Sequence, residues 1–369
     1  MTTFAGAAVF DGTTLREGVL SVADGRVGDA ATGPVERLEG GWLLPGLLDL
    51  QVNGGGGHQV SGATTVADLV MMCRVHERLG ATGILPTLIT DTPEATAAVI
   101  AAGIEAARAK VPGFLGLHLE GPHLDPRRKG AHDPALIRPM TDGDLNRLCE
   151  GANALPSLMV TLAPESATPA QIAALASAGV VVSLGHTDCS LAAAQAALAA
   201  GASCVTHLFN AMSQLGNREP GLVGAALTGT PFCGLIADGI HVAPETMRIA
   251  VAAAPGRLFL VSDCMAAAGT DVTEFTLGTR RILRRDGRLT LEDGTLAGAD
   301  LTLPQAIRTM VERVGAPPEA AFAMATSRPA ACLGRSDIGH LRPGDRADFV
   351  HLGPDFRLRG VWRAGNRVL

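Results

Sequence analysis

The chain has 369 residues, of which 47% are hydrophobic and 18% are charged, so it is long and apolar enough for one large folded domain with a smaller one, and disorder is disfavoured. A net charge of −6 and a pI near 5.9 argue against a general nucleic-acid-binding protein, and seven cysteines without a CxxC pair suit reduced thiols. The N-terminus has no basic region before an apolar stretch and no run of 18 apolar residues occurs, so we expect a cytoplasmic protein that does not span a membrane.

The two ends of the chain differ in pattern from its middle. Residues 1–45 contain short alternating segments with turns at Asp11-Gly12 and Asp24-Gly25, which is typical of small antiparallel strands. The tail 342–369 has the same character. Neither end can bury a core alone, so we expect 1–45 and 342–369 to form one small β-sandwich domain, with a catalytic domain over 46–341.

Between these ends, short apolar runs alternate with segments of helical spacing. We expect eight buried parallel strands, at 46–52, 82–90, 113–119, 157–163, 180–185, 203–207, 232–237 and 258–263. Four prolines predict helix starts: Pro93, Pro169, Pro244 and Pro304. Four glycines predict helix ends: Gly151, Gly179, Gly201 and Gly315. Eight strands alternating with helices predict a (β/α)₈ TIM barrel, with a β-hairpin insertion at 272–296.

Four of the predicted strands end in a side chain that can bind a metal or move a proton: Glu120, His186, His207 and Asp263. Active sites of such barrels lie at the C-terminal ends of the strands. A lone histidine is more often structural, but one carboxylate and two imidazoles at equivalent strand ends favour a catalytic metal site, where bound water has a pKa of about 7. We interpret Asp263 as a general base and then acid; the alternative is a cap or turn aspartate.

For other polar residues the sequence leaves two roles open or indicates contact with a ligand. His118 faces the barrel interior, either as a further ligand or as a structural residue. The loop 127–134 carries His132, an imidazole placed to touch a ligand. The polar loop 210–221 should contact substrate, and Arg218 within it either binds a phosphate or is solvated.

Several segments together carry a resemblance to a known family: Pro45–Gly54, Gly116–Pro122, Lys129–His132, Gly185–Thr187, Thr206–Met212, Arg218–Gly221, Ala237–His241, Ser262–Asp263 and Leu296–Ala299. Over nearly its whole length the chain resembles the N-acetylglucosamine-6-phosphate deacetylases of the amidohydrolase superfamily. The resemblance implies hydrolysis of N-acetyl-D-glucosamine 6-phosphate to D-glucosamine 6-phosphate and acetate, in amino-sugar catabolism and cell-wall recycling. The alternatives are an N-acetylgalactosamine-6-phosphate deacetylase, another amidohydrolase, or a barrel that only binds.

The resemblance also implies roles for single residues. Glu120, His186 and His207 match metal ligands, Asp263 matches the catalytic acid/base, and His132 matches the residue that polarises the acetyl carbonyl. The implied substrate contacts are Ala131, His132, Asn210, Ala211, Arg218, Asp238, His241, Ala297, Gly298 and Ala299. In the family a loop arginine can reach the phosphate of the neighbouring subunit, so a homodimer with shared sites is implied.

One departure from the wider superfamily bears on the metal count. The usual His-x-His after the first strand is here Gln51-Val52-Asn53, and amide side chains are poor zinc ligands. A carboxylated lysine bridge is disfavoured because the only lysines, Lys110 and Lys129, lie away from strand ends. We predict one divalent metal per subunit, Zn²⁺, with Fe²⁺ and Co²⁺ accepted by the same ligands. Gln51 should then support a ligand or contact substrate.

Overall fold

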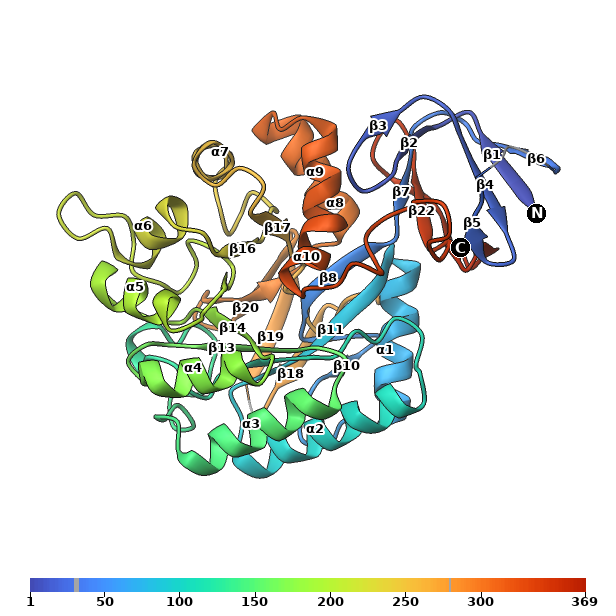
Figure 1. The fold of residues 1–369 in the computed structure, drawn as a ribbon. Coiled ribbons are helices and arrows are strands. Elements are labelled where there is room, and N and C mark those ends of the chain that lie inside the picture. Colours follow the sequence, from blue (N-terminus) through green and yellow to red (C-terminus); the bar gives the residue numbers. More distant parts are fainter. Residues whose placement is uncertain (30–32, 279) are drawn as a thin grey trace.

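A barrel of eight parallel strands surrounded by helices forms the centre of the computed structural model, which describes residues 1–29, 33–278 and 280–369 (Figure 1). Each strand pairs with the next along the chain, so the predicted TIM barrel is confirmed. The barrel strands are β8 (Leu47–Val52), β11 (Ala81–Ile89), β12 (Leu117–Glu120), β13 (Leu158–Leu162), β14 (Val181–Leu184), β15 (Cys204–Val205), β16 (Phe232–Leu235) and β17 (Leu258–Leu260).

The third strand is shorter than its predicted range, 113–119. It begins at Leu117 because Gly116 has a φ of +134°, outside the extended conformation of a strand. The last strand ends at Leu260 and not at 263, so the chain has already left the sheet where it reaches Asp263.

The barrel closes where its first strand meets the segment after its last strand. The Asp263 backbone N–H donates to the Gln51 carbonyl at 3.0 Å, and the Asn53 N–H donates to the Cys264 carbonyl at 2.9 Å. Below them, the buried Asp49 carboxylate accepts a hydrogen bond from the Ser262 backbone N–H at 3.2 Å. Burial raises the pKa of Asp49 to about 7. This closure brings the Asn53 amide, which follows the first strand, beside the predicted acid/base.

Helices cover the outside of the barrel, and none in the described part of the chain is long and apolar enough to cross a membrane. They are α1 (Val66–Arg78), α2 (Pro93–Arg108), α3 (Asp142–Ala154), α4 (Pro169–Ser177), α5 (Leu191–Ala199), α6 (Gly221–Thr228), α7 (Pro244–Ala253), α8 (Leu303–Thr309), α9 (Pro318–Ala325) and α10 (Ser327–Cys332), with short turns η1 (Pro126–Arg128) and η2 (Met310–Val314). The predicted helix starts are confirmed within one residue, at Pro93, Pro169, Pro244 and Pro304.

The predicted helix end at Gly151 is wrong, because α3 continues to Ala154. Gly151 faces α2, where an added Cβ would lie 3.4 Å from the Ile100 side chain, so this glycine lets two helices approach closely. The other three glycines do follow helix ends and have positive φ, as predicted: Gly179, Gly201 and Gly315.

Both chain ends contribute to a separate pair of β-sheets, as predicted (Figure 1). One sheet has the order β5-β4-β1-β6 and the other β24-β23-β22-β7-β2-β3, and residues 30–32 of the predicted range lie outside the described residues. A common core of Phe4, Leu43, Phe349 and Trp362 with smaller apolar side chains joins them. The strands are β1 (Thr2–Ala5), β2 (Ala8–Phe10), β3 (Leu15–Arg16), β4 (Val19–Ala23), β5 (Arg26–Val27), β6 (Val35–Arg37), β7 (Trp42–Pro45), β22 (Phe349–Leu352), β23 (Leu358–Arg363) and β24 (Asn366–Arg367).

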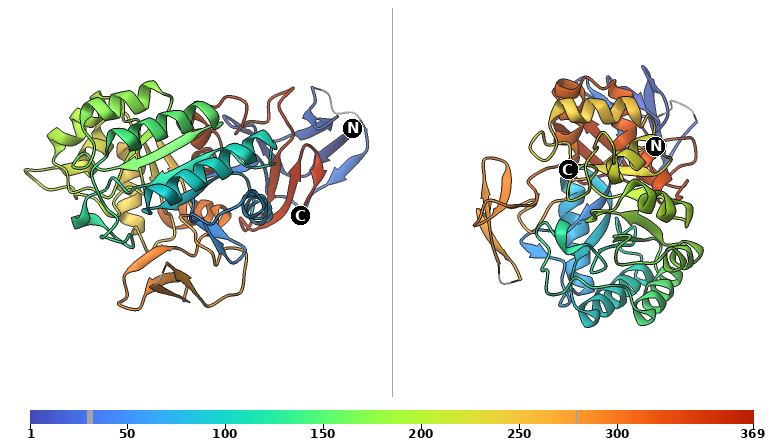
Figure 2. Two further views of the ribbon diagram at one scale, coloured as in Figure 1. Left: turned by 90° about the horizontal axis from the view of Figure 1, so that it is seen from below. Right: turned by 90° about the vertical axis from the view of Figure 1, so that its left-hand side faces the viewer.

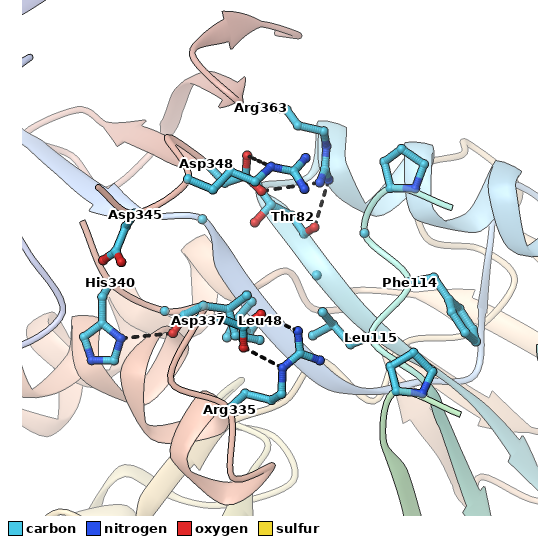
Figure 3. Close-up of a pocket in the computed structure, with 18 of the residues that line it drawn as sticks. Leu48, Thr82, Phe114, Leu115, Arg335, Asp337, His340, Asp345, Asp348 and Arg363 are labelled. Atoms are coloured by element: carbon cyan, nitrogen blue, oxygen red, sulfur yellow. Dashed lines mark hydrogen bonds and ion pairs between the residues drawn. The ribbon is translucent and has the colours of Figure 1, made fainter. Parts of the chain in front are cut away.

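A polar cavity of 540 Å³ lies between these sheets and the N-terminal ends of the barrel strands (Figure 3). Arg335 donates to Asp337 at 2.6 Å, and Arg363 donates to the Thr82 carbonyl at 2.8 Å and to Glu77 on α1. The Arg363 contacts attach the terminal sheets to the end of the barrel opposite the predicted site.

The predicted hairpin at 272–296 is a larger structure. It is a four-stranded antiparallel sheet that ends at Ala299 and stands beside the barrel, and residue 279 lies outside the described residues (Figure 2). The Arg280 side chain donates to the Ala131 carbonyl, which ties the sheet to the loop after β12. Its strands are β18 (Glu274–Leu277), β19 (Arg280–Arg285), β20 (Arg288–Leu291) and β21 (Leu296–Ala299); a short hairpin after β8 comprises β9 (Gly54–Gly55) and β10 (His58–Gln59).

Candidate metal centre and active site

The four predicted strand-end residues meet in one cavity of 150 Å³ at the C-terminal end of the barrel. Glu120 is the last residue of β12, whereas His186, His207 and Asp263 lie two or three residues beyond their strands. The backbone of these three residues has left-handed φ values of 47°, 29° and 48°. Such conformations cost about 1–3 kcal/mol each in a non-glycine residue and cluster at functional sites.

Three potential ligand atoms converge at the floor of this cavity. Glu120 Oε1 lies 3.2 Å from His186 Nε2 and 3.1 Å from His207 Nε2, and the two imidazole nitrogens are 3.1 Å apart. Ligands held about 2.0–2.1 Å from a tetrahedral zinc ion lie about 3.3 Å from one another. The spacing of the three atoms therefore fits one face of a tetrahedral metal site.

The hydrogen bonding of His186 supports the same conclusion. Its Nδ1 donates to the Arg128 carbonyl at 2.8 Å, so in the neutral ring Nε2 carries a lone pair. That lone pair faces the Glu120 carboxylate at 3.2 Å, and two acceptors this close need either a proton or a metal ion between them. A backbone carbonyl that fixes the other nitrogen is a common support for a metal-binding histidine.

The electrostatics of the three residues favour positive charge between them. Burial alone would raise the pKa of Glu120, but the hydrogen bonds and charges of His186 and His207 outweigh it and hold that pKa well below its ordinary value. Burial would lower the pKa of His207, but Glu120 outweighs it and raises that pKa. The donor set of one carboxylate and two imidazoles fits a divalent metal.

A second set of ligands overlaps the first. Glu120, His132 and His186 also place one potential ligand atom each within 4.8 Å of one another. His132 Nδ1, however, already lies 2.8 Å from Thr90 Oγ1, whereas the hydrogen-bonding partners of His207 Nε2 among the described residues both belong to the cluster and lie 3.1 Å away. We therefore prefer the set that contains His207.

Two amides at the end of β8, Gln51 within it and Asn53 just after it, bind the acidic groups of the site. Gln51 Nε2 donates to Glu120 Oε1 at 3.1 Å, and Asn53 Nδ2 donates to Asp263 Oδ1 at 2.7 Å. Asn53 is absent from the sequence-predicted site, although its place two residues after Gln51 puts both on one face of the strand. Its Oδ1 is buried without a partner among the described residues, so it is free to accept from a ligand.

The Asp263 carboxyl lies in the same cavity as Glu120, His186 and His207. Burial and the nearby Glu120 charge raise the pKa of its carboxyl to about 6, against the opposing effects of His207, His241 and the Asn53 hydrogen bond. A general base works best with a pKa near the operating pH.

The sequence leaves two roles open for His118, a further ligand or a structural residue, and its hydrogen bonds favour the structural role. Its Nε2 lies 2.7 Å from Thr161 Oγ1 and its Nδ1 lies 3.3 Å from Thr87 Oγ1. Thr161 in turn lies 2.6 Å from Thr206 Oγ1, which lies 2.6 Å from Ser183 Oγ. These side chains form a hydrogen-bonded layer across the barrel beneath the ligand cluster.

The predicted substrate contacts divide into three groups. Those that line the cavity are Ala131, His132, Asn210, His241, Ala297 and Gly298. Those that do not line it but lie close by are Gln51, Ala211, Asp238 and Ala299; Asp238 Oδ2 lies 2.6 Å from His241 Nδ1, and the Ala299 N–H donates to the Asp263 carbonyl at 2.8 Å. Arg218 lies in an exposed loop and does not line the cavity of its own chain.

Comparison with known proteins places the chain among metal-dependent hydrolases of this fold. The amidohydrolase family model matches residues 42–368. The chain is 40% identical to an N-acetylgalactosamine-6-phosphate deacetylase of Shewanella sp. (strain ANA-3), over 90% of this chain and 84% of that protein. It is 34% identical to an N-acetylglucosamine-6-phosphate deacetylase of Haemophilus influenzae, over 88% and 86% of the two chains.

Among solved structures, the crystal structure of an N-acetylglucosamine-6-phosphate deacetylase from Pasteurella multocida superposes with a TM-score of 0.94. It is 31% identical and the match covers 99% of both chains. Sequence and fold thus agree from one end of the chain to the other. The chain therefore belongs to the amidohydrolase family, in the branch that contains the N-acetylhexosamine-6-phosphate deacetylases.

Proposed function

We propose that this protein is a metal-dependent hydrolase that removes the acetyl group from N-acetyl-D-glucosamine 6-phosphate. The observation that carries the proposal is the convergence of Glu120 Oε1, His186 Nε2 and His207 Nε2 within 3.2 Å, in one cavity with Asp263 and His132. Relatives that are 34–40% identical bear the names of deacetylases of phosphorylated amino sugars.

Glu120, His186 and His207 would hold one divalent ion per chain, for which we propose zinc. When bound, the ion supplies a Lewis acid that polarises the acetyl carbonyl and activates water. Gln51 restrains the Glu120 carboxylate, and the Arg128 carbonyl restrains His186, so the chain itself orients two of the three ligands.

Asp263 takes a proton from the attacking water and then gives it to the departing amine. Asn53 holds one oxygen of this carboxylate at 2.7 Å, which leaves the other for the proton. His132 donates a hydrogen bond to the carbonyl oxygen as negative charge develops on it, and such stabilisation is commonly the largest single catalytic contribution. Asp238 holds the His241 ring in the wall of the cavity, and His241 would bind the sugar phosphate there.

Acetate release from purified, zinc-loaded protein tests this function. We expect turnover of N-acetylglucosamine 6-phosphate and much weaker turnover of N-acetylglucosamine, which lacks the phosphate. One zinc per chain by elemental analysis and loss of turnover after chelation should accompany it. A zinc-loaded preparation that releases no acetate from any phosphorylated N-acetylhexosamine would exclude the proposal.

N-acetylgalactosamine 6-phosphate is a second candidate substrate, because the 40%-identical relative is named for that epimer. The two sugars differ only in the configuration of one hydroxyl group, away from the amide. The ratio of kcat/KM for the two phosphosugars, measured side by side, decides between them.

We also propose a homodimer in which Arg218 serves the partner's site. Phosphate is usually bound by arginine or lysine. Neither residue type occurs among the described residues that line the cavity, which supports a phosphate-binding arginine from a second chain. Arg218 is exposed on the loop after β15, three residues after Leu215, which is 59% exposed. The loop is thus free to contact a second copy.

Arg218→Ala should lower kcat/KM for the phosphorylated sugar by about 10- to 100-fold, the loss expected for one charged hydrogen bond. Arg308→Ala, at an exposed arginine of α8, is the control. Mixing Arg218→Ala with Asp263→Asn subunits discriminates the geometry. If Arg218 acts across the interface, hybrid dimers contain one intact site and activity returns; if it acts within its own chain, mixing restores nothing.

A further inference from the structure

We infer that Thr90 is a positioning residue that keeps the proton of His132 on Nε2, so that His132 acts as a hydrogen-bond donor in the cavity and not as a metal ligand. The inference deepens the proposed function and rests on it. Thr90 directly follows β11, and its side chain reaches the ring of His132 in the loop after β12.

Two groups of Thr90 contact the same ring nitrogen. The Thr90 hydroxyl lies 2.8 Å from His132 Nδ1, and the Thr90 backbone N–H donates to that nitrogen at 3.3 Å. A hydroxyl can donate or accept, but an amide N–H can only donate. Nδ1 must therefore carry a lone pair, which puts the single ring proton on Nε2.

The neighbouring histidine has the opposite arrangement. His186 Nδ1 faces a carbonyl, that of Arg128 at 2.8 Å, so its Nε2 carries the lone pair. The rings of His132 and His186 are 4.3 Å apart between centroids, and both are buried. The Thr90 backbone N–H thus leaves the proton of His132 on Nε2, where it can be donated to substrate. The Arg128 carbonyl leaves a lone pair on His186 Nε2, where it can bind a metal.

The surroundings of Thr90 are shaped for this contact. Gly121, with a φ of +88°, lies against the Thr90 hydroxyl, and a Cβ at this position would overlap Oγ1. Thr90 is 5% exposed, so water does not compete for the hydroxyl. A glycine at 121 is therefore required for Thr90 to reach the ring.

The zinc-loaded wild-type protein, with ¹⁵N-labelled histidine, gives the first test. His132→Asn assigns the His132 signals by their disappearance. We expect Nδ1 to resonate as an unprotonated nitrogen and Nε2 as a protonated one, with no direct bond to metal. A protonated Nδ1, or a metal-bound Nε2, would overturn the inference. This spectrum needs no substrate, so it is independent of whether the proposed reaction is correct.

Substitution of Thr90 gives the second test. Thr90→Val removes the hydroxyl at nearly constant shape, and we expect the Nδ1 signal to move downfield and kcat to fall about tenfold with KM little changed. Thr90→Ser should restore both. Thr96→Val, which removes another buried threonine hydroxyl, on the outer helix α2, should leave kcat unchanged.

In the His132→Asn background, Thr90→Val should cause no additional loss of kcat, because Thr90 acts through His132. A further loss of similar size in that background would assign Thr90 a role independent of His132. Should Thr90→Val not fold, the wild-type spectrum and Thr90→Ser still decide the protonation of the ring.

Discussion

Asp263→Asn is expected to lower kcat by about 10²- to 10⁴-fold, the usual range for loss of an acid–base group, while the protein still binds one metal ion per chain. An amide cannot take the proton of the attacking water or return it to the amine. The three ligand atoms do not include Asp263, so the metal should remain. Acetate release at saturating substrate, together with elemental analysis of the same preparation, measures both quantities.

Asp337→Asn is a matched control for this variant. Asp337 pairs with Arg335 at the opposite end of the barrel, so its replacement removes a carboxylate without touching the site. We expect its kcat to equal that of the wild type. Near-normal turnover by metal-loaded Asp263→Asn would remove Asp263 from acid–base catalysis and leave the metal site as the only supported part of the mechanism.

The barrel and the meeting of the four strand-end residues were predictable because each depends on local signals. Parallel strands buried on both faces appear as apolar runs, and prolines at Pro93 and Pro169 mark the helices between them. Once eight such units close into a barrel, the residues that follow the strands must lie at one end. Glu120 and His207 are 87 positions apart in the chain, yet this topology is enough to bring them together.

The four-stranded sheet after the barrel was underestimated because its strands do not look buried. Arg280–Arg285 contains four arginines and only Ile282 of this strand is fully buried. Most residues of the sheet are exposed or only partly buried, so the alternation of apolar and polar residues is weak. The error at Gly151 has a related cause, since a glycine that permits helix contact and one that ends a helix are identical in sequence.

Within the site, the residues that orient others were the hardest to predict. Asn53 and Thr90 act by donating to Asp263 and His132, and these pairs form only when separate strands are adjacent. The backbone carbonyl of Arg128, which fixes His186, has no signature in any side chain. Sequence patterns therefore indicate which groups can do chemistry, whereas three-dimensional contacts decide their protonation.

Glu120→Gln is expected to weaken zinc binding by more than about 100-fold and to abolish turnover at ordinary metal concentrations, because an amide oxygen is a poor zinc ligand. The fold should persist, since a glutamine side chain has nearly the shape of the glutamate that it replaces and can still accept from Gln51. Zinc at about 100 times the Kd of the wild type should stabilise the wild type by about 2.7 kcal/mol and the variant by less than about 0.4 kcal/mol. Thermal unfolding with and without zinc measures this difference, and Glu245→Gln on α7 is the control.

Loss of zinc from Glu120→Gln supports a metal site but does not choose its third ligand, because Glu120 and His186 belong to both possible sets. Replacement of each remaining histidine makes that choice. His207→Asn should lose zinc as Glu120→Gln does, whereas His132→Asn should retain one zinc per chain and lose kcat. The opposite result would make His132 the ligand. Its Nδ1 would then have to carry the ring proton and donate to the Thr90 hydroxyl, and the inference about Thr90 would be wrong.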